Sequence, residues 1–254
     1  MDTGLKDRVV LLTGAGGGAG GAVAAAFAAE GASVAMNHRG SASSTSRAEA
    51  QAEAIRTAGG RALAITADLR SSDEIGVMVG RIERELGPVA VLVTATSAYR
   101  NDRFEGLTDE AWSSVVDDML GATYRTCRAV TPGMEAVGWG RIVNVAARSG
   151  LTGVARSAHY AAAKAGIIGL TKSLAKELGP KGILVNAIAP TQILTSKDGA
   201  PSIPEERQAD MAKAIPLRRL ATPDDLAALV VWLGSAANTY VSGEVVSLTG
   251  GAQS

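Results

Sequence analysis

Tyr160 and Lys164 lie four residues apart in the stretch Tyr160-Ala161-Ala162-Ala163-Lys164. On an α-helix, residues at this spacing share one face, so we expect the lysine ammonium to sit beside the phenol. A neighbouring positive charge favours the phenolate and lowers the pKa of a tyrosine, which makes the phenol a usable proton donor near neutral pH. The pair therefore predicts proton transfer to or from a bound substrate.

A glycine-rich stretch, Thr13-Gly14-Ala15-Gly16-Gly17-Gly18-Ala19-Gly20, follows the first strand-like run of the chain. Glycines between a strand and a helix let the backbone turn tightly and approach a pyrophosphate, which then faces the N-terminus of the helix. The stretch therefore predicts dinucleotide binding. Its register stays open between two spacings, Gly14/Gly18/Gly20 and Gly16/Gly18/Gly21.

The residues after the second strand-like run bear on the choice of cofactor. They read Asn37-His38-Arg39-Gly40-Ser41 and include no Asp or Glu to accept a hydrogen bond from a free ribose hydroxyl. Arg39 is suited to a 2′-phosphate, so NADP(H) is favoured over NAD(H). His38 is expected beside the adenosine. Asp68, after the third strand-like run, is expected either at the adenine edge or as an acidic residue at a helix N-terminus.

Short aliphatic or β-branched runs alternate with Ala-rich helical stretches along the chain. This alternation predicts a parallel sheet with helices on both faces, and right-handed connections make it doubly wound. We therefore expect one α/β domain of the Rossmann type over residues 1–254. Strands are predicted at Arg8–Leu12, Ser33–Asn37, Ala62–Thr66, Val89–Thr94, Arg141–Val145, Ile183–Ile188 and Glu244–Leu248.

Two segments lack a clear helical or strand pattern. Residues Gly40–Ser46 are rich in Ser and Gly, and residues Thr191–Pro204 separate the sixth strand from a polar helix. Both are predicted to be irregular and mobile. The second lies where a lid over a ligand could close, so a small substrate lid is expected around residues 191–215.

The bulk composition excludes several classes of function. The chain has 254 residues and a formal net charge of zero, and no long charge run points to nucleic acid. No stretch of about 20 residues is apolar enough to span a membrane. The polar N-terminus does not resemble a signal peptide, so a cytoplasmic protein is expected. Cys127 is the only cysteine, which excludes an intrachain disulfide and a cysteine metal cluster, and no metal site is predicted.

Taken together, these motifs resemble the short-chain dehydrogenase/reductase family in its compact form. The resemblance covers essentially the whole chain and includes Val185-Asn186-Ala187-Ile188-Ala189-Pro190 and the terminal Thr249-Gly250-Gly251. It implies a nicotinamide cofactor, a small-molecule substrate and assembly as homotetramers or homodimers. Tyr160 would be the general acid/base, Lys164 would bind the nicotinamide ribose and lower the tyrosine pKa, and Thr195 would reach the carboxamide. The expected cofactor-binding residues are Thr13, Gly14, Gly18, Gly20, His38, Arg39, Asp68, Lys164, Pro190 and Thr195.

Four departures from the family pattern fall around the substrate side of the site. Where such enzymes usually show Asn-Asn-Ala-Gly after the fourth strand, this chain reads Thr94-Ala95-Thr96-Ser97. The serine position, thirteen residues before the tyrosine, is Ala147. The helix asparagine position, seven residues after Trp112, is Met119, and the Pro-Gly after the sixth strand is Pro190-Thr191.

These departures remove groups that the resembled mechanism uses. The serine would donate a hydrogen bond to the substrate carbonyl, and loss of one such donor costs on the order of 10²–10³ in rate. The asparagine would hold a water that relays protons to the lysine. Substitute donors are expected among Ser149, Thr94, Thr96, Ser97 and His159. Arg100 or Arg148 could hold an anionic group, and the expected pocket residues are Thr96, Ser97, Tyr99, Met119, Ala147 and Ser149.

Three functions stay open at this point. The first is an NADPH-dependent oxidoreductase that transfers hydride to a carbonyl of a small or medium hydrophobic substrate. The second is reduction of an imine or iminium, which is already electrophilic and needs no serine donor. The third is a cofactor-binding scaffold or sensor without turnover, in which Lys164 persists to bind ribose.

Overall fold

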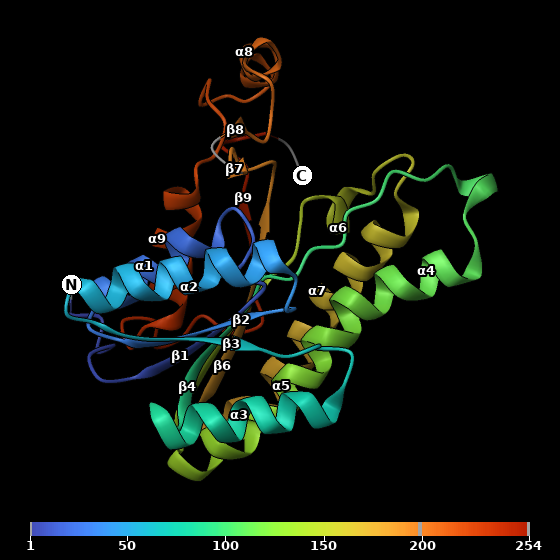
Figure 1. Ribbon diagram of the computed structural model, residues 1–254. Helices are drawn as coiled ribbons and strands as arrows, with labels where there is room; N and C mark the ends of the chain where they lie inside the picture. Colours follow the sequence, from blue (N-terminus) through green and yellow to red (C-terminus); the bar gives the residue numbers. More distant parts are fainter. Residues whose placement is uncertain (1, 198–199, 253–254) are drawn as a thin grey trace.

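The computed structural model describes residues 2–197 and 200–252, in which one main sheet carries helices on both faces (Figure 1). The sheet is parallel and follows the order β3-β2-β1-β4-β5-β6-β9. The predicted doubly wound α/β fold is confirmed, and the predicted strand ends differ from the observed ones by at most two residues. The strands are β1 (Val9–Thr13), β2 (Ser33–His38), β3 (Arg61–Thr66), β4 (Val89–Thr94), β5 (Gly140–Val145), β6 (Ile183–Pro190) and β9 (Val245–Leu248).

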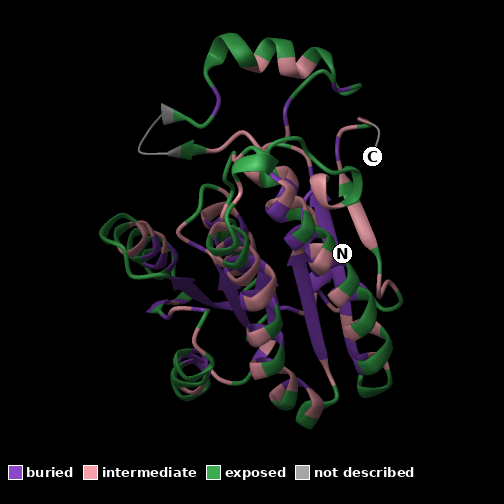
Figure 2. Ribbon diagram, turned by 90° about the vertical axis from the view of Figure 1, so that its right-hand side faces the viewer, coloured by how far each residue is buried: buried purple, intermediate pink, exposed green. Residues whose placement is uncertain are grey.

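Long helices cover both faces of the sheet, and Figure 2 shows the strands buried between these two layers. The residues of the helices that face outward are exposed, as expected for a three-layer arrangement. On one face lie α1 (Gly20–Ala29), α2 (Ala42–Thr57) and α9 (Pro223–Gly234). On the other face lie α3 (Ser72–Glu85), α5 (Ala122–Val137) and α7 (Ala158–Leu178).

Strand β1 shows why the sheet can be predicted from the sequence. All five of its residues are buried. Val10 and Leu12 belong to the core beneath α1 and α9, whereas Val9 and Leu11 belong to the core beneath α3 and α5. A parallel strand that is covered on both faces needs apolar side chains at successive positions. An unbroken aliphatic run therefore marks it.

Helix α2 begins inside a segment that the sequence pattern predicts to be irregular. Ser41 is its N-cap, and the Ser41 hydroxyl accepts a hydrogen bond from the Ser44 backbone N–H at 3.4 Å. Serine competes for backbone hydrogen bonds at helix ends, so a Ser-rich stretch resembles a loop. The prediction for Gly40–Ser46 is therefore wrong from Ala42 onward.

A π-helical turn, η2 (Asp117–Gly121), joins α4 (Asp109–Val116) to α5. Nothing in the sequence pattern predicts it. Asp118 and Met119 are both buried in this turn. Met119 packs in one cluster with Ala163 and Ile167 of α7, so the turn is part of the contact between α7 and the neighbouring helix.

The remaining elements are short, and several lie in the segment predicted as a lid. β7 (Ser196–Lys197) and β8 (Ala200–Pro201) pair antiparallel, and α8 (Glu205–Lys213) follows them and stands clear of the main sheet (Figure 1). The segment is thus partly regular, and its residues 198 and 199 lie outside the described residues. No described helix combines the length and hydropathy that a membrane span needs. The short elements are η1 (Phe104–Gly106), α6 (Ser149–Thr152), η3 (Gly179–Lys181), β7 (Ser196–Lys197), β8 (Ala200–Pro201) and α8 (Glu205–Lys213).

The two phenylalanines of the chain provide a matched test of the core. Phe27 of α1 is fully buried, whereas Phe104 is 77% exposed. We expect Phe27→Ala to lower the free energy of unfolding by about 3–5 kcal/mol, because it leaves a cavity beneath α1. Phe104→Ala should change it by about 0.5 kcal/mol or less. Equilibrium urea denaturation measures both, and equal effects would contradict this assignment of the core.

Candidate active site

Two joined cavities open at the carboxyl ends of the parallel strands. The smaller, of about 470 Å³, lies beside the ends of β2 and β3, and we name it the β2-side cavity. The larger, of about 1000 Å³, lies beside β5 and β6, and we name it the β5-side cavity. Gly14, Gly17, Thr96, Ser97 and Tyr99 line both, so the two form one groove across the strand ends. Open parallel sheets bind ligands at this position.

Three glycines between the end of β1 and the first residue of α1 have no room for a side chain. Gly14 has φ +68°, and a Cβ there would lie 2.6 Å from the Ala95 carbonyl oxygen. A Cβ on Gly18 would lie 2.5 Å from the Cβ of Thr195. A Cβ on Gly20 would clash with the backbone of the loop itself. These neighbours are backbone or branched atoms that cannot move aside easily, so each position requires glycine.

The contacts favour the Gly14/Gly18/Gly20 spacing over the alternative. A Cβ on Gly21 would meet only the flexible end of the Gln51 side chain. The N-cap of α1, Ala19, makes no side-chain hydrogen bond, and the first turn carries no acidic residue. The N–H groups and the positive end of the helix dipole are therefore available to an anion such as a pyrophosphate. The residues present fit a dinucleotide cofactor.

The β2-side cavity contains the arginine that is predicted to select the cofactor. Arg39 lines it with a side chain that is 56% exposed. Nη2 of Arg39 lies 3.5 Å from Oδ2 of Asp118, a buried carboxylate on the π-helical turn. Oδ1 of Asp118 lies 3.9 Å from Nε of Arg70, so one buried acid faces two guanidinium groups. Sequence reasoning missed Asp118, because its partners lie far away along the chain.

Asp68 and His38 also line this cavity, but their polar atoms have partners within the chain. Arg70 donates hydrogen bonds to both carboxylate oxygens of Asp68, and this is the main reason why the pKa of Asp68 lies below its usual value. Nδ1 of His38 accepts a hydrogen bond from the Gly40 N–H at 3.3 Å. Burial lowers the pKa of the His38 imidazole, so the ring is neutral at neutral pH. Both side chains shape the cavity wall.

Lys164 lines the β5-side cavity and is almost completely buried. Its Nζ donates hydrogen bonds to the backbone carbonyls of Thr96 at 3.1 Å and Val145 at 2.8 Å. Burial lowers the pKa of the ammonium to about 8, because a low-dielectric environment disfavours its charge. One carbonyl follows β4 and the other ends β5, so the ammonium ties α7 to the ends of two strands.

Tyr160 lines the same cavity, one helical turn before Lys164. Nζ of Lys164 lies 5.9 Å from the centre of the Tyr160 ring. Burial raises the pKa of the phenol, and hydrogen bonding to the Ser97 side chain opposes this only in part. The prediction that Lys164 lowers the tyrosine pKa is therefore not met in this geometry. The reason is that the ammonium is directed at backbone carbonyls rather than at the phenol.

A buried hydrogen-bond chain holds α7 against the sheet. Oγ1 of Thr94 donates to Oδ1 of Asn144 at 2.8 Å, and Nδ2 of Asn144 donates to Oγ1 of Thr171 at 2.9 Å. These residues belong to β4, β5 and α7, and all three are buried. Thr94 is thereby excluded as a substitute donor to substrate, since its hydroxyl hydrogen is already used inside the protein.

Most of the other predicted site residues do line the β5-side cavity. Ala147 stands there with a methyl group at the position where the family pattern has a serine hydroxyl. Ser149 on α6, two residues further along the chain, also lines this cavity. The predicted residues that share this lining are Gly14, Gly18, Gly20, Thr96, Ser97, Tyr99, Ala147, Ser149, Tyr160, Lys164, Pro190 and Thr195.

Besides Thr94, three predicted residues lie outside the lining of both cavities. Met119 is fully buried against α7, so it lies behind the residues that line the β5-side cavity. Thr13 is buried, and its Oγ1 accepts a hydrogen bond from the Ala95 N–H at 3.3 Å, which joins the ends of β1 and β4. His159 is fully buried, and its Nε2 lies 3.2 Å from a carboxylate oxygen of Asp102. None of the three side chains reaches the lining of either cavity in this structure.

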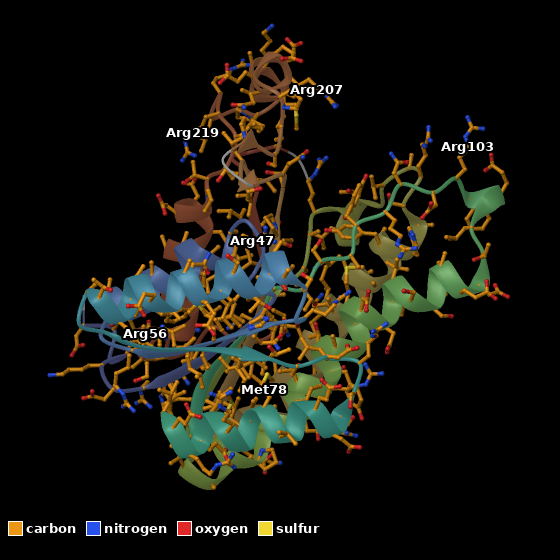
Figure 3. All side chains as sticks on the ribbon, in the orientation of Figure 1. Arg47, Arg56, Met78, Arg103, Arg207 and Arg219 are labelled. Atoms are coloured by element: carbon orange, nitrogen blue, oxygen red, sulfur yellow. The ribbon has the colours of Figure 1, made fainter. Side chains whose placement is uncertain are left out.

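Helix α8 contributes to the β5-side cavity in a way that its sequence does not reveal. Arg207 projects from α8 (Figure 3) and lines the cavity together with Met211. The polar sequence of a surface helix does not indicate that one of its faces lines a cavity. Among the described residues, the charged groups lining this cavity are all basic, namely Arg148, Lys164 and Arg207. No cluster in the described part of the chain is suited to a metal ion.

The buried ammonium predicts how stability changes with pH. In the unfolded chain Lys164 keeps its proton up to a pKa of 10.5, whereas the folded pKa is about 8. Between these values the unfolded state binds more protons, so the contribution of Lys164 to stability rises with pH. We expect the free energy of unfolding of the wild type, minus that of Lys164→Met, to increase across this range. Guanidinium denaturation at several pH values measures the difference, and a flat or falling profile would contradict a buried ammonium.

Known proteins match this chain over nearly its whole length. The family model described as enoyl-(acyl carrier protein) reductase matches residues 14–253. Nodulation protein G of Azospirillum brasilense is 35% identical over 247 residues, which cover 97% of this chain and 98% of that protein. The 3-oxoacyl-(acyl-carrier-protein) reductase FabG of Pseudomonas aeruginosa shows the same identity and coverage. The protein of that name from Staphylococcus epidermidis is 34% identical over 245 residues, 96% of this chain and 98% of the relative. By these matches and by its fold, the chain belongs to the short-chain dehydrogenase/reductase family of oxidoreductases.

Proposed function

We propose that the protein is an NADPH-dependent oxidoreductase that transfers hydride to the carbonyl group of a small or medium hydrophobic substrate. The observation that carries the proposal is the placement of Tyr160 and Lys164 in a cavity that continues to the glycine-rich loop. A dinucleotide along that loop would extend toward the tyrosine. Family membership supports hydride transfer, and two of the relatives are named as reductases of a 3-oxoacyl group.

The chemistry divides between the cofactor and Tyr160. NADPH, when bound, supplies the hydride. Tyr160 donates its phenolic proton to the carbonyl oxygen as the carbonyl carbon accepts the hydride, which yields an alcohol and leaves a phenolate. Because burial raises the pKa of Tyr160, the phenol is protonated at neutral pH. This is the state that a general acid requires, so Tyr160 holds a proton for transfer to the carbonyl oxygen.

Lys164 is proposed to bind the nicotinamide ribose. An ammonium has three N–H donors, and two are directed at the carbonyls of Thr96 and Val145. The third is left for a ribose hydroxyl.

The preference for NADPH is proposed from Arg39. No acid follows β2 to bond a free ribose hydroxyl, and a guanidinium pairs well with a 2′-phosphate. Asp118 restricts the Arg39 side chain, since its carboxylate lies 3.5 Å from Nη2. A side chain that is already restricted loses less entropy on binding.

The lining of the β5-side cavity supports a substrate with apolar surface. Val154, Met211, Ile215 and Leu220 contribute aliphatic side chains. Ala147 offers no hydroxyl to the substrate, so the carbonyl oxygen must be held by other donors. The loop after β4 contributes hydroxyl groups to the lining from Thr96 and Ser97.

Residues 191–215 are proposed to act as a substrate lid. Gln192, Ile193 and Met211 from this segment line the β5-side cavity. Thr195 packs against the glycine-rich loop at Gly18, so the segment already touches the expected path of the cofactor.

Assembly as a homotetramer or homodimer and a cytoplasmic location are proposed from the family resemblance alone.

Substitution of Arg39 tests the cofactor preference. We expect Arg39→Gln to weaken NADPH binding about tenfold or more, because a charged contact to the 2′-phosphate is lost, and to leave NADH binding unchanged. Arg56→Gln is the matched control, since Arg56 lies on α2 outside the lining of the β2-side cavity and pairs with Glu53 at 2.7 Å. Isothermal titration calorimetry measures both cofactors. Equal losses for NADPH and NADH, or tighter binding of NADH by the wild type, would refute the role of Arg39.

Substitution of Tyr160 tests the proton donor. We expect Tyr160→Phe to lower kcat by about 10²–10⁴-fold and to leave NADPH affinity near that of the wild type. Tyr240→Phe is the control, because Tyr240 is 96% exposed. NADPH absorbance is followed against a panel of ketones and cyclic imines. Full activity of Tyr160→Phe would remove the tyrosine from the acid role, and activity restricted to imines would replace the carbonyl proposal.

A further inference from the structure

The loop between β4 and η1 (residues 95–103) lies along the first turns of α7, the helix that carries Tyr160. Its contacts with α7 are spread along the loop rather than confined to one point. They join Thr96 O to Lys164 Nζ at 3.1 Å, the ring of Tyr99 to that of Tyr160 with centroids 5.2 Å apart, Arg100 O to Ser157 Oγ at 2.6 Å, and Asp102 Oδ2 to His159 Nε2 at 3.2 Å.

The position of this loop shapes both cavities. Thr96, Ser97 and Tyr99 line each of them. Residues 95–103 belong to no helix or strand, and Ser97 and Tyr99 are exposed. A loop without secondary structure has no backbone ladder to define its conformation. Its conformation therefore depends on the contacts with α7.

His159 contacts Asp102, which lies near the end of the loop that leads into η1. Its side chain is fully buried, and Nδ1 has no hydrogen-bond partner among the described residues. A hydrogen on Nδ1 would be buried without an acceptor, which is costly. We therefore place a hydrogen on Nε2, which donates it to Asp102, whose side chain is 40% exposed. The donor belongs to the rigid helix and the acceptor to the loop.

We propose that His159 and Asp102 are positioning residues of the active site, whose hydrogen bond holds the loop against α7 and so keeps Ser97 and Tyr99 beside Tyr160. The kinetic consequence rests on the proposed reductase function, whereas the loop contact itself does not. Loss of the bond releases the outer end of the loop and loosens the packing of Tyr99 on Tyr160. The substrate side of the groove is then affected more than the Arg39 end, because Arg39 follows β2 and lies outside this loop.

Hydrogen exchange of the loop amides tests the contact without any assay of activity. We expect Asp102→Ala to raise the exchange rates at residues 97–102 about tenfold, because loss of a charge-assisted hydrogen bond makes local opening easier. Exchange in β1 and α1 should not change. Glu105→Ala is the matched control, since Glu105 is an exposed acid of the neighbouring η1 that pairs with Arg103 at 3.4 Å. Unchanged loop exchange in Asp102→Ala, or an equal rise in Glu105→Ala, would overturn the proposal.

Two variants of His159 separate the hydrogen bond from the filling of space. His159→Leu fills the buried site and removes the donor, whereas His159→Gln keeps an N–H donor on a side chain of similar reach. We expect fast loop exchange in the first variant and exchange close to the wild type in the second. Equal exchange in the two variants would refute a role for the hydrogen bond. If His159→Leu does not fold, Asp102→Ala still decides the question, because it changes a partly exposed side chain on the loop.

Kinetics on a substrate of the wild type then test the effect on catalysis. We expect Asp102→Ala to raise KM about five- to tenfold with a smaller change in kcat, because the wall that holds the substrate loosens while Tyr160 stays on its helix. His159→Gln, which keeps an N–H donor, should have a KM close to that of the wild type. An unchanged KM in Asp102→Ala would contradict the positioning role. Absence of turnover in the wild type would instead refute the proposed function, and the exchange rates would still decide whether this pair holds the loop.

Discussion

The buried ammonium of Lys164 is the interaction on which the rest of the site depends. It leaves water and binds the carbonyls that follow β4 and end β5. A buried charge without such partners is strongly unfavourable, so α7 has one position over the strand ends. Tyr160 and His159 lie within the two preceding turns of the same helix and take their places from it. The buried hydrogen bonds from Thr94 through Asn144 to Thr171 hold the same helix against β4 and β5.

Burial also acts in the same sense on the two residues of the site. It lowers the pKa of Lys164 to about 8 and raises the pKa of Tyr160, and each shift favours the neutral form of the group. A neutral phenol can donate a proton, which suits reduction. Because Ala147 removes the hydroxyl that the family pattern places after β5, the hydroxyl groups of the loop after β4 become more important. Attachment of that loop to α7 is then part of the site.

Much of the fold could be predicted because it depends on patterns between near neighbours. The aliphatic run of β1 and the glycines at the start of α1 report burial and close backbone approach directly. The prediction was wrong where one local pattern has two meanings, as in the Ser-rich start of α2, where Ser41 is a cap. It missed the turn at Asp117–Gly121, because packing of Met119 against α7 stabilises that turn and no residue within it is diagnostic.

The residues themselves specify which chemical groups the protein has and which it lacks: a phenol and an ammonium one helical turn apart, glycines after the first strand, and no serine at Ala147. Spacing within one turn or loop can be interpreted directly, because neighbours in sequence are then neighbours in space. Packing alone settled that Met119 lies behind the wall, that Asp118 faces Arg39 and that Asp102 meets His159. Each of these contacts joins segments from different elements, and their side chains meet only when α7 and the π-helical turn pack over the sheet.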